Sequence, residues 1–399
     1  MNKAEERLLG ALRHAIRGET VSRGESVSQA ELQELIHLAH IHRVLPMVVE
    51  AICPGHQVEA ERQFALQQII RQASRTAEFL LLYEELIKRG LHPTVMKGVV
   101  LRSMYPQPEQ RPSTDEDLLV SDDEYPAIHE ALLDCGLHVD GDPAPDAEEI
   151  TYRDKSRGLY LEVHRRLFNE NSDAYGDCNT PFNGVLERTV TVQIEGTQIR
   201  TLAPTDHMLY LICHAYKHVL HGGVGIRQVC DMGMFTQRYG TEIDWPYVVS
   251  ACEALHIRRF AEALFAIGEQ YLGLDAPEGF DGTDVDVVPL LDDMLSGGVY
   301  GAEDINRLHS STLTLDAVAA DRSGRRRGGA LHSVFLPVKD LAWRYPYLQK
   351  RPWLLPVAWT QRIWGYLTRG KGSQAVKPAE TLRIGRDRID LLRRYGIID

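Results

Sequence analysis

The spacing of apolar residues changes twice along this chain of 399 residues, and the two changes limit the folds it can adopt. In residues 1–89, apolar positions recur every three or four residues, which is typical of amphipathic helices. From Leu91 the pattern becomes short alternating runs separated by turn residues, which indicates strands mixed with short helices. Helical spacing returns after residue 203. The sequence therefore predicts an α+β fold, with a mixed-sheet core between helical N-terminal and C-terminal regions.

These changes predict four regions. We expect a helical N-terminal region at residues 1–89, an α/β core at 90–203, a helical domain at 204–320 and a basic C-terminal region at 321–399. Within the core, short strands are expected at the segments LHPTVMK, DEDLLV and GLYLEVHRRL. The segment TVTVQIEGTQIRTL predicts a β-hairpin that turns at Glu195-Gly196.

Charge is distributed unevenly along the chain. The net charge of −12 argues against general nucleic-acid binding. Residues 321–399 nevertheless hold 17 basic and 6 acidic residues, a net charge of +11, against −23 for the first 320 residues. This basic region, with four of the five tryptophans, suits an acidic partner or the headgroup layer of a membrane as a peripheral protein. It equally suits docking of the region onto the acidic body of the same chain.

Cysteine usage and hydropathy predict where the protein resides. Six cysteines are scattered along the chain without a CxxC pair, which suits a reduced compartment. No apolar run reaches the roughly 18 residues that a membrane-spanning helix needs. We therefore expect a soluble, cytoplasmic protein.

The segment from Val95 to Val120 holds the strongest candidate for a functional site. Its closing residues place Asp115, Glu116 and Asp117 at the start of an apolar run. If this run is a strand, Asp115 and Asp117 point to one face and Glu116 to the other. Two carboxylates about 6 to 7 Å apart on one strand face can share a hard cation such as Mg²⁺. Asp115 and Asp117 are therefore predicted catalytic metal ligands.

A third carboxylate is expected from a neighbouring strand. In GLYLEVHRRL, Glu162 and His164 fall on the same strand face. Three carboxylates converging from two strands would form a two-metal site for phosphoryl or nucleotidyl transfer. Glu162 is predicted to be the third ligand, or the general base that deprotonates an acceptor hydroxyl. His164 would orient Glu162 or contact phosphate.

Several residues near this segment are candidates for phosphate binding. A turn at Gly98 would let backbone N–H groups approach the phosphates, helped by the start of the following helix. Lys97, Arg111 and Ser113 are further candidate phosphate donors.

The helix expected after Pro204 adds one more candidate cation. His214 and His218 are four residues apart but lack the acidic residue of an HExxH zinc motif, so an anionic ligand facing Lys217 and these histidines is the better interpretation. Further along, Arg227 and Asp231 could form an exposed ion pair on one helix face.

These residues together resemble a known family. The segment is similar to the nucleotidyltransferase superfamily of the DNA polymerase β type, and more closely to poorly characterised bacterial nucleotidyltransferase-like proteins with a KG…L…YP…R…DxDLLV signature. In this chain the signature reads Lys97-Gly98, Leu101, Tyr105-Pro106, Arg111 and Asp115 to Val120. Later matches are Glu162 to His164, His214 to His218, Arg227-Gln228, Asp231, Phe335 to Pro337, Arg344 to Pro346 and Pro352 to Pro356.

The resemblance implies an α+β nucleotidyltransferase core. It implies Mg²⁺-dependent transfer of a nucleoside monophosphate from a nucleoside triphosphate, with ATP as the expected nucleotide, to a hydroxyl or similar acceptor on a small molecule, peptide or protein. One feature departs from the superfamily, because Val99 follows Gly98 where a serine is usual, so Lys97 or Ser113 would take the role of that serine. The alternative is a non-catalytic, partner-binding protein of the same fold, such as a toxin–antitoxin or biosynthetic-complex component.

Overall fold

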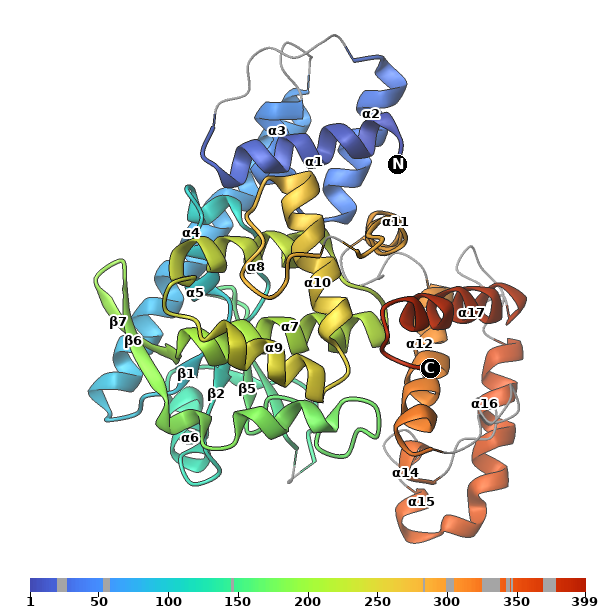
Figure 1. Cartoon of the computed structure of the whole chain (residues 1–399). Helices are drawn as coiled ribbons and strands as arrows, with labels where there is room; N and C mark the ends of the chain where they lie inside the picture. Colours follow the sequence, from blue (N-terminus) through green and yellow to red (C-terminus); the bar gives the residue numbers. More distant parts are fainter. Residues whose placement is uncertain are drawn as a thin grey trace.

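In the part of the chain that this computed structural model describes, helices surround one seven-stranded sheet (Figure 1). The structure describes residues 1–19, 27–52, 58–144, 147–282, 284–298, 305–324, 338–341, 345, 347–368 and 378–399. Strands lie between residues 94 and 202, and the described residues before and after them are helices and their connections. The predicted α+β fold with helical regions at both ends is therefore confirmed.

The sheet is mixed, and its strand order brings the predicted site strands together. The order is β3-β4-β5-β2-β1-β7-β6. Strand β2 pairs in parallel with β5 and antiparallel with β1, while β1 pairs in parallel with β7. The strands are β1 (Thr94–Val95), β2 (Glu116–Leu119), β3 (His138–Val139), β4 (Glu149–Asp154), β5 (Leu159–His164), β6 (Thr189–Ile194) and β7 (Thr197–Leu202). The predicted hairpin of β6 and β7 turns at Glu195 and Gly196, both with positive φ.

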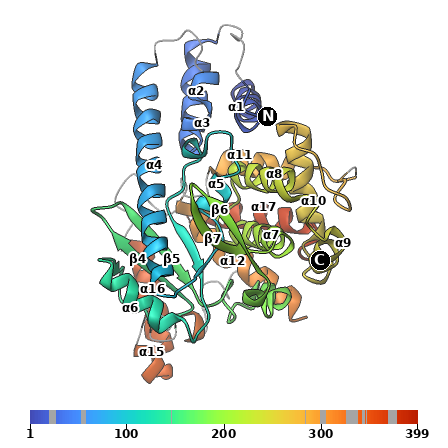
Figure 2. The same cartoon turned by 90° about the vertical axis from the view of Figure 1, so that its left-hand side faces the viewer.

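One face of the sheet is covered by two helices. The C-terminal half of the long helix α4 (Glu59–Lys88) packs Phe79 and Leu86 into a core that also holds Val163 of β5. Helix α6 (Tyr125–Asp134) adds Ile128 to the same core. The N-terminal half of α4 contacts α3 instead, beside α1 and α2 (Figure 2). These first helices are α1 (Lys3–Ile16), α2 (Gln29–Ile41) and α3 (Leu45–Ile52).

The opposite face of the sheet meets the central helices. Helix α7 (Pro204–His221) begins with a proline in its first turn, as predicted, and ends before Gly222. Its apolar residues share one large core with Met96 and Leu119 of the sheet. The neighbouring elements are α8 (Ile226–Tyr239), α9 (Trp245–Ala254), α10 (Arg258–Ile267), η4 (Gly268–Leu272) and α11 (Val288–Gly297).

The C-terminal region packs against the end of α7. Arg307 donates a hydrogen bond to the carbonyl of Gly222, and Arg388 donates to the carbonyl of Val219. Positive side chains suit this position, because the last carbonyls of a helix carry partial negative charge. The elements are α12 (Ile305–Arg322), α14 (Val338–Leu341), α15 (Tyr347–Lys350), η6 (Pro352–Leu354), α16 (Leu355–Thr368) and α17 (Pro378–Arg394). Docking onto the body of the chain, one of the interpretations of residues 321–399, therefore holds for α17, whereas α12 lies almost wholly before that region.

The other interpretations of this region, membrane contact and an acidic partner, stay predictions. Trp353 is 70% exposed, Trp343 lies outside the described residues, and the side chain of Trp364 lies outside them as well. Among the helices that the structure describes, none is long and apolar enough to span a bilayer.

Candidate active site

The pairing of β2 with β5 brings three predicted site residues together. In the parallel register Asp117 lies opposite Glu162, and Leu119 lies opposite His164. Paired residues point to the same face of a sheet, so all three polar side chains share the face toward α7. One ligand atom from each of Asp117, Glu162 and His164 lies within 4.8 Å of the others. Within the described part of the chain, this is the one group of three such residues, and Asp115 is not in it.

Asp117 is buried among positive and polar neighbours. Lys97 Nζ lies 3.0 Å from Asp117 Oδ1, and His164 Nε2 lies 3.2 Å from the same oxygen. Burial by itself would raise the pKa of Asp117, but Lys97 and His164 outweigh it and hold the pKa well below its ordinary value. Asp117 is therefore a carboxylate at neutral pH.

Glu162 has the opposite electrostatic balance. Burial, followed by the charges of Asp117, Glu149 and Asp115, raises the pKa of Glu162 to about 8. His164 Nε2 lies 3.8 Å from Glu162 Oε2. Two facing carboxylates repel each other when both are ionised, so Glu162 keeps its proton to a higher pH than an ordinary glutamate.

The donor set fits a divalent cation. Asp117 and Glu162 supply carboxylate oxygens, the ligands that Mg²⁺ prefers, and His164 supplies an imidazole nitrogen. A cation between them would offset the burial and the charge repulsion that together raise the pKa of Glu162.

Helix α7 forms the other wall of the site. Lys97 Nζ lies 3.0 Å from His214 Nε2, and His218 Nε2 lies 3.1 Å from the same nitrogen. Burial and then the charge of Lys97 lower the pKa of both histidines well below the ordinary value, so both imidazoles are neutral. Lys217 is half-buried beside them and makes no hydrogen bond or ion pair with any residue that the structure describes. This face of α7 therefore adds two neutral imidazoles, His214 and His218, and the ammonium group of Lys217 to the site.

Glu116 points away from Asp117, as predicted, and organises the Gly98 turn. Its Oε2 accepts a hydrogen bond of 2.7 Å from the Val99 N–H, the first amide of the short helix α5 (Val99–Arg102). The other carboxylate oxygen pairs with the buried guanidinium of Arg102. Gly98 has φ +55, and a Cβ at this position would lie 1.8 Å from Glu116 Oε2. We expected the backbone N–H groups at the Gly98 turn to face phosphate, but the Val99 N–H donates its hydrogen bond to Glu116 instead.

Arg111 anchors the loop before β2. Its guanidinium makes two hydrogen bonds to Asp231 of α8, at 2.6 and 2.7 Å, and Tyr105 donates a third at 2.7 Å. Arg111 is 4% exposed, so this pair is internal to the fold. The expected exposed pair of Arg227 with Asp231 is wrong, because Asp231 is buried with Arg111 and Arg227 donates to the carbonyl of Pro112.

Ser113 also shapes this loop. Its hydroxyl donates to the carbonyl of Asp115 at 2.9 Å, and its N–H donates to Gln72 of α4 at 2.8 Å. The serine therefore fixes the backbone that leads into the Asp115-to-Asp117 segment.

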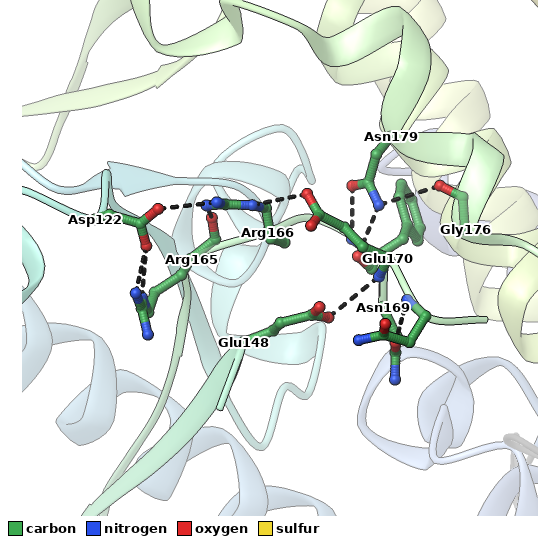
Figure 3. A network of polar contacts seen from close by, with 10 residues as sticks. Asp122, Glu148, Arg165, Arg166, Asn169, Glu170, Gly176 and Asn179 are labelled. Carbon is green, nitrogen blue, oxygen red and sulfur yellow. Dashed lines mark hydrogen bonds and ion pairs between the residues drawn. The ribbon is translucent and has the colours of Figure 1, made fainter. Parts of the chain in front are cut away.

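Sequence reasoning missed a polar network just beyond the site strands (Figure 3). Asp122, which follows β2, accepts from Arg165 Nε at 2.7 Å and from Arg166 Nη2 at 2.8 Å, both of which follow β5. Arg166 Nε also donates to Glu170 at 2.8 Å, and the Glu170 N–H donates to Glu148 at 3.3 Å. The network ties the ends of the two strands together next to His164. Its local signal in the sequence was a pair of arginines directly after one strand and an acidic pair shortly after the other.

Comparison with known proteins agrees with this geometry. Residues 28–273 match a family model described as an uncharacterised nucleotidyltransferase. Because the match covers more than half of the chain, the protein belongs to this family of transferases. No curated protein and no solved structure matches the chain. The C-terminal helices α12 to α17 lie outside the matched residues.

Proposed function

We propose that this protein transfers a nucleoside monophosphate from a nucleoside triphosphate, with ATP as the first candidate, to a hydroxyl-type acceptor on a small molecule, peptide or protein. The observation that carries the proposal is the convergence of Asp117, Glu162 and His164 on one face of β2 and β5, with ligand atoms within 4.8 Å of one another. A carboxylate pair of this kind is what a metal-dependent phosphoryl or nucleotidyl transfer site requires.

Asp117 and Glu162 are the proposed metal ligands, with His164 beside them. Asp115, two residues before Asp117 and outside this group, is proposed as a further ligand. Bound Mg²⁺ would supply charge neutralisation on the triphosphate and would lower the pKa of the attacking hydroxyl. Glu162 is also the proposed acceptor of that proton, because its carboxyl lies beside Asp117 on the same face of the paired strands. Asp117 stays ionised and holds Lys97 in place through their 3.0 Å contact.

Lys97 and Lys217 are the proposed phosphate-binding cations. Lys97 reaches the carboxylates from the β1 side, and Lys217 lies on the facing helix α7. His214 accepts a hydrogen bond from the Lys97 ammonium, which has donors only, and so fixes its position. Gly98 and Ser113 support the site through the backbone turns they form, and Arg111 supports it by anchoring the loop.

Membership of a transferase family favours this catalytic interpretation over a partner-binding protein. The test is label transfer from triphosphates carrying the label on the α or the γ phosphate, with Mg²⁺ and a fractionated metabolite and protein extract as the source of acceptors. Nucleotidyl transfer predicts that α label, and not γ label, moves to an acceptor. Asp117→Asn should lower the transfer at least about a hundredfold. Transfer of γ label, or equal transfer by the Asp117→Asn variant, would contradict the proposal.

A further inference from the structure

Helix α4 carries an apolar stripe on its solvent side. Leu66, Ile70 and Leu81 are 55%, 59% and 62% exposed, and the exposed Ala73 and Ala77 lie between them. The five residues follow one another at intervals of three or four, which places them on one line along a helix. Figure 2 shows α4 running along this side of the molecule from α2 and α3 down to the sheet. The exposure of these residues is therefore contiguous rather than scattered, which is typical of an interaction surface.

The stripe has the spacing of a helix-pairing seam. Polar residues continue the same line at both ends, with Glu59 and Gln63 before it and Glu84 and Lys88 after it. Steps of three and four residues keep the side chains on one side of the helix, where a second helix can pack along them. At 30 residues, α4 is about 45 Å long, enough for several turns of contact.

Four of the five stripe residues are placed symmetrically about one point on the helix, which lies between Ala73 and Ser74. Leu66 and Leu81 are equally far from that point, and so are Ile70 and Ala77. Glu59 and Lys88 are also equally far from that point, on opposite sides of it. A surface that is complementary to itself after a half-turn is what a two-fold dimer requires.

We propose that α4 pairs antiparallel with α4 of a second copy of this chain. In this pairing Leu66 packs on Leu81 of the second copy, and Glu59 lies opposite Lys88 of the second copy. A parallel pairing would instead bring Glu59 against Glu59 and Lys88 against Lys88, so charge favours the antiparallel arrangement.

A second charge pair supports this choice of partner. Arg71 and Glu78 lie on the same flank of α4, seven residues apart and nearly symmetric about the midpoint. Neither makes an ion pair with any residue in the described part of the chain. In the antiparallel dimer Arg71 of each copy comes close to Glu78 of the other. The dimer does not depend on the proposed chemistry.

The first test is sedimentation of the full chain over a range of roughly 1 to 100 μM. We expect a reversible dimer, and we expect the double variant Leu66→Glu/Leu81→Glu to raise its dissociation constant at least about a hundredfold. Val288→Glu is the matched control, because Val288 is 47% exposed on α11, away from the stripe. Circular dichroism melting of each variant shows that it is folded. A monomer at every concentration, or a dimer that the double variant leaves intact, would overturn the proposal.

The second test is disulfide trapping, which distinguishes antiparallel from parallel pairing of the two α4 helices. The single variants Glu59→Cys and Lys88→Cys should each stay uncrosslinked, because the two copies of one position lie far apart along antiparallel helices. A mixture of the two variants should form an interchain disulfide. Crosslinking of Glu59→Cys alone would mean parallel pairing, and crosslinking in neither case would mean another interface; both results contradict the proposal.

Discussion

Replacing Glu162 with glutamine should make the metal-free protein more stable at alkaline pH. The pKa of this carboxyl is about 8 in the folded chain against an ordinary value of 4.5. An unfolded chain therefore releases the proton at lower pH than the folded chain, and ionisation opposes folding progressively from pH 4.5 to about 8. Glutamine resembles the protonated acid and removes that penalty.

The magnitude follows from the difference between the two pKa values. At 1.36 kcal/mol per pKa unit, this difference corresponds to a destabilisation of the folded chain by at most about 5 kcal/mol. Glu162 and Asp117 titrate as an interacting pair, so replacing Glu162 alone recovers only part of this energy. We expect the free energy of unfolding of the variant to rise by about 2 kcal/mol at pH 9 and by almost nothing near pH 5. The same substitution removes the proposed proton acceptor, so transfer activity should fall at least about a hundredfold.

Urea unfolding with a metal chelator, followed by circular dichroism at both pH values, measures this gain. Glu130→Gln is the matched control, because Glu130 is exposed on α6 and outside the site. It should change the free energy of unfolding by less than about 0.5 kcal/mol at either pH. A Glu162→Gln variant that is no more stable than wild type at pH 9, or equally more stable at both pH values, would refute the electrostatic argument.

Three further predictions test the site and its surroundings. Binding of Mg²⁺ should release a proton from Glu162 at pH 7, because the pKa of this carboxyl is raised in the metal-free site, and calorimetry in two buffers measures the release; its absence would count against this ligand. Arg111→Met should lower the free energy of unfolding by about 3 to 5 kcal/mol, because it leaves Asp231 buried without its partner; a stable variant with a raised KM for nucleotide would mean that Arg111 binds phosphate instead. Gly98→Ala should destabilise the fold by more than about 2 kcal/mol in thermal unfolding, because its Cβ would overlap Glu116, and an unchanged melting temperature would contradict that contact.

Local patterns were enough to predict the strands that carry the site. Alternation placed Asp117 on one face of its strand with Glu116 on the other, and it placed Glu162 with His164. The positive-φ turn of the hairpin was also predictable, because glycine follows an acidic residue between two alternating runs.

Long-range partners could not be predicted in this way. Nothing local pairs Arg111 with Asp231, which lies 120 residues away. Strand β4 was not predicted, because its six residues include charged groups at both ends, and pairing with β5 is what makes it a strand. The carboxylate of Glu116 facing Arg102 and the Val99 amide likewise depends on how α5 folds back onto β2.

The most direct test of the central claim is a crystal structure with Mn²⁺ and a non-hydrolysable nucleoside triphosphate. Mn²⁺ takes the same oxygen ligands as Mg²⁺ and is located by its anomalous scattering. We predict an anomalous peak about 2.2 Å from carboxylate oxygens of both Asp117 and Glu162, with the triphosphate reaching Lys97. A triphosphate and metal bound elsewhere on the chain, or bound here without contact to Asp117, would contradict the account.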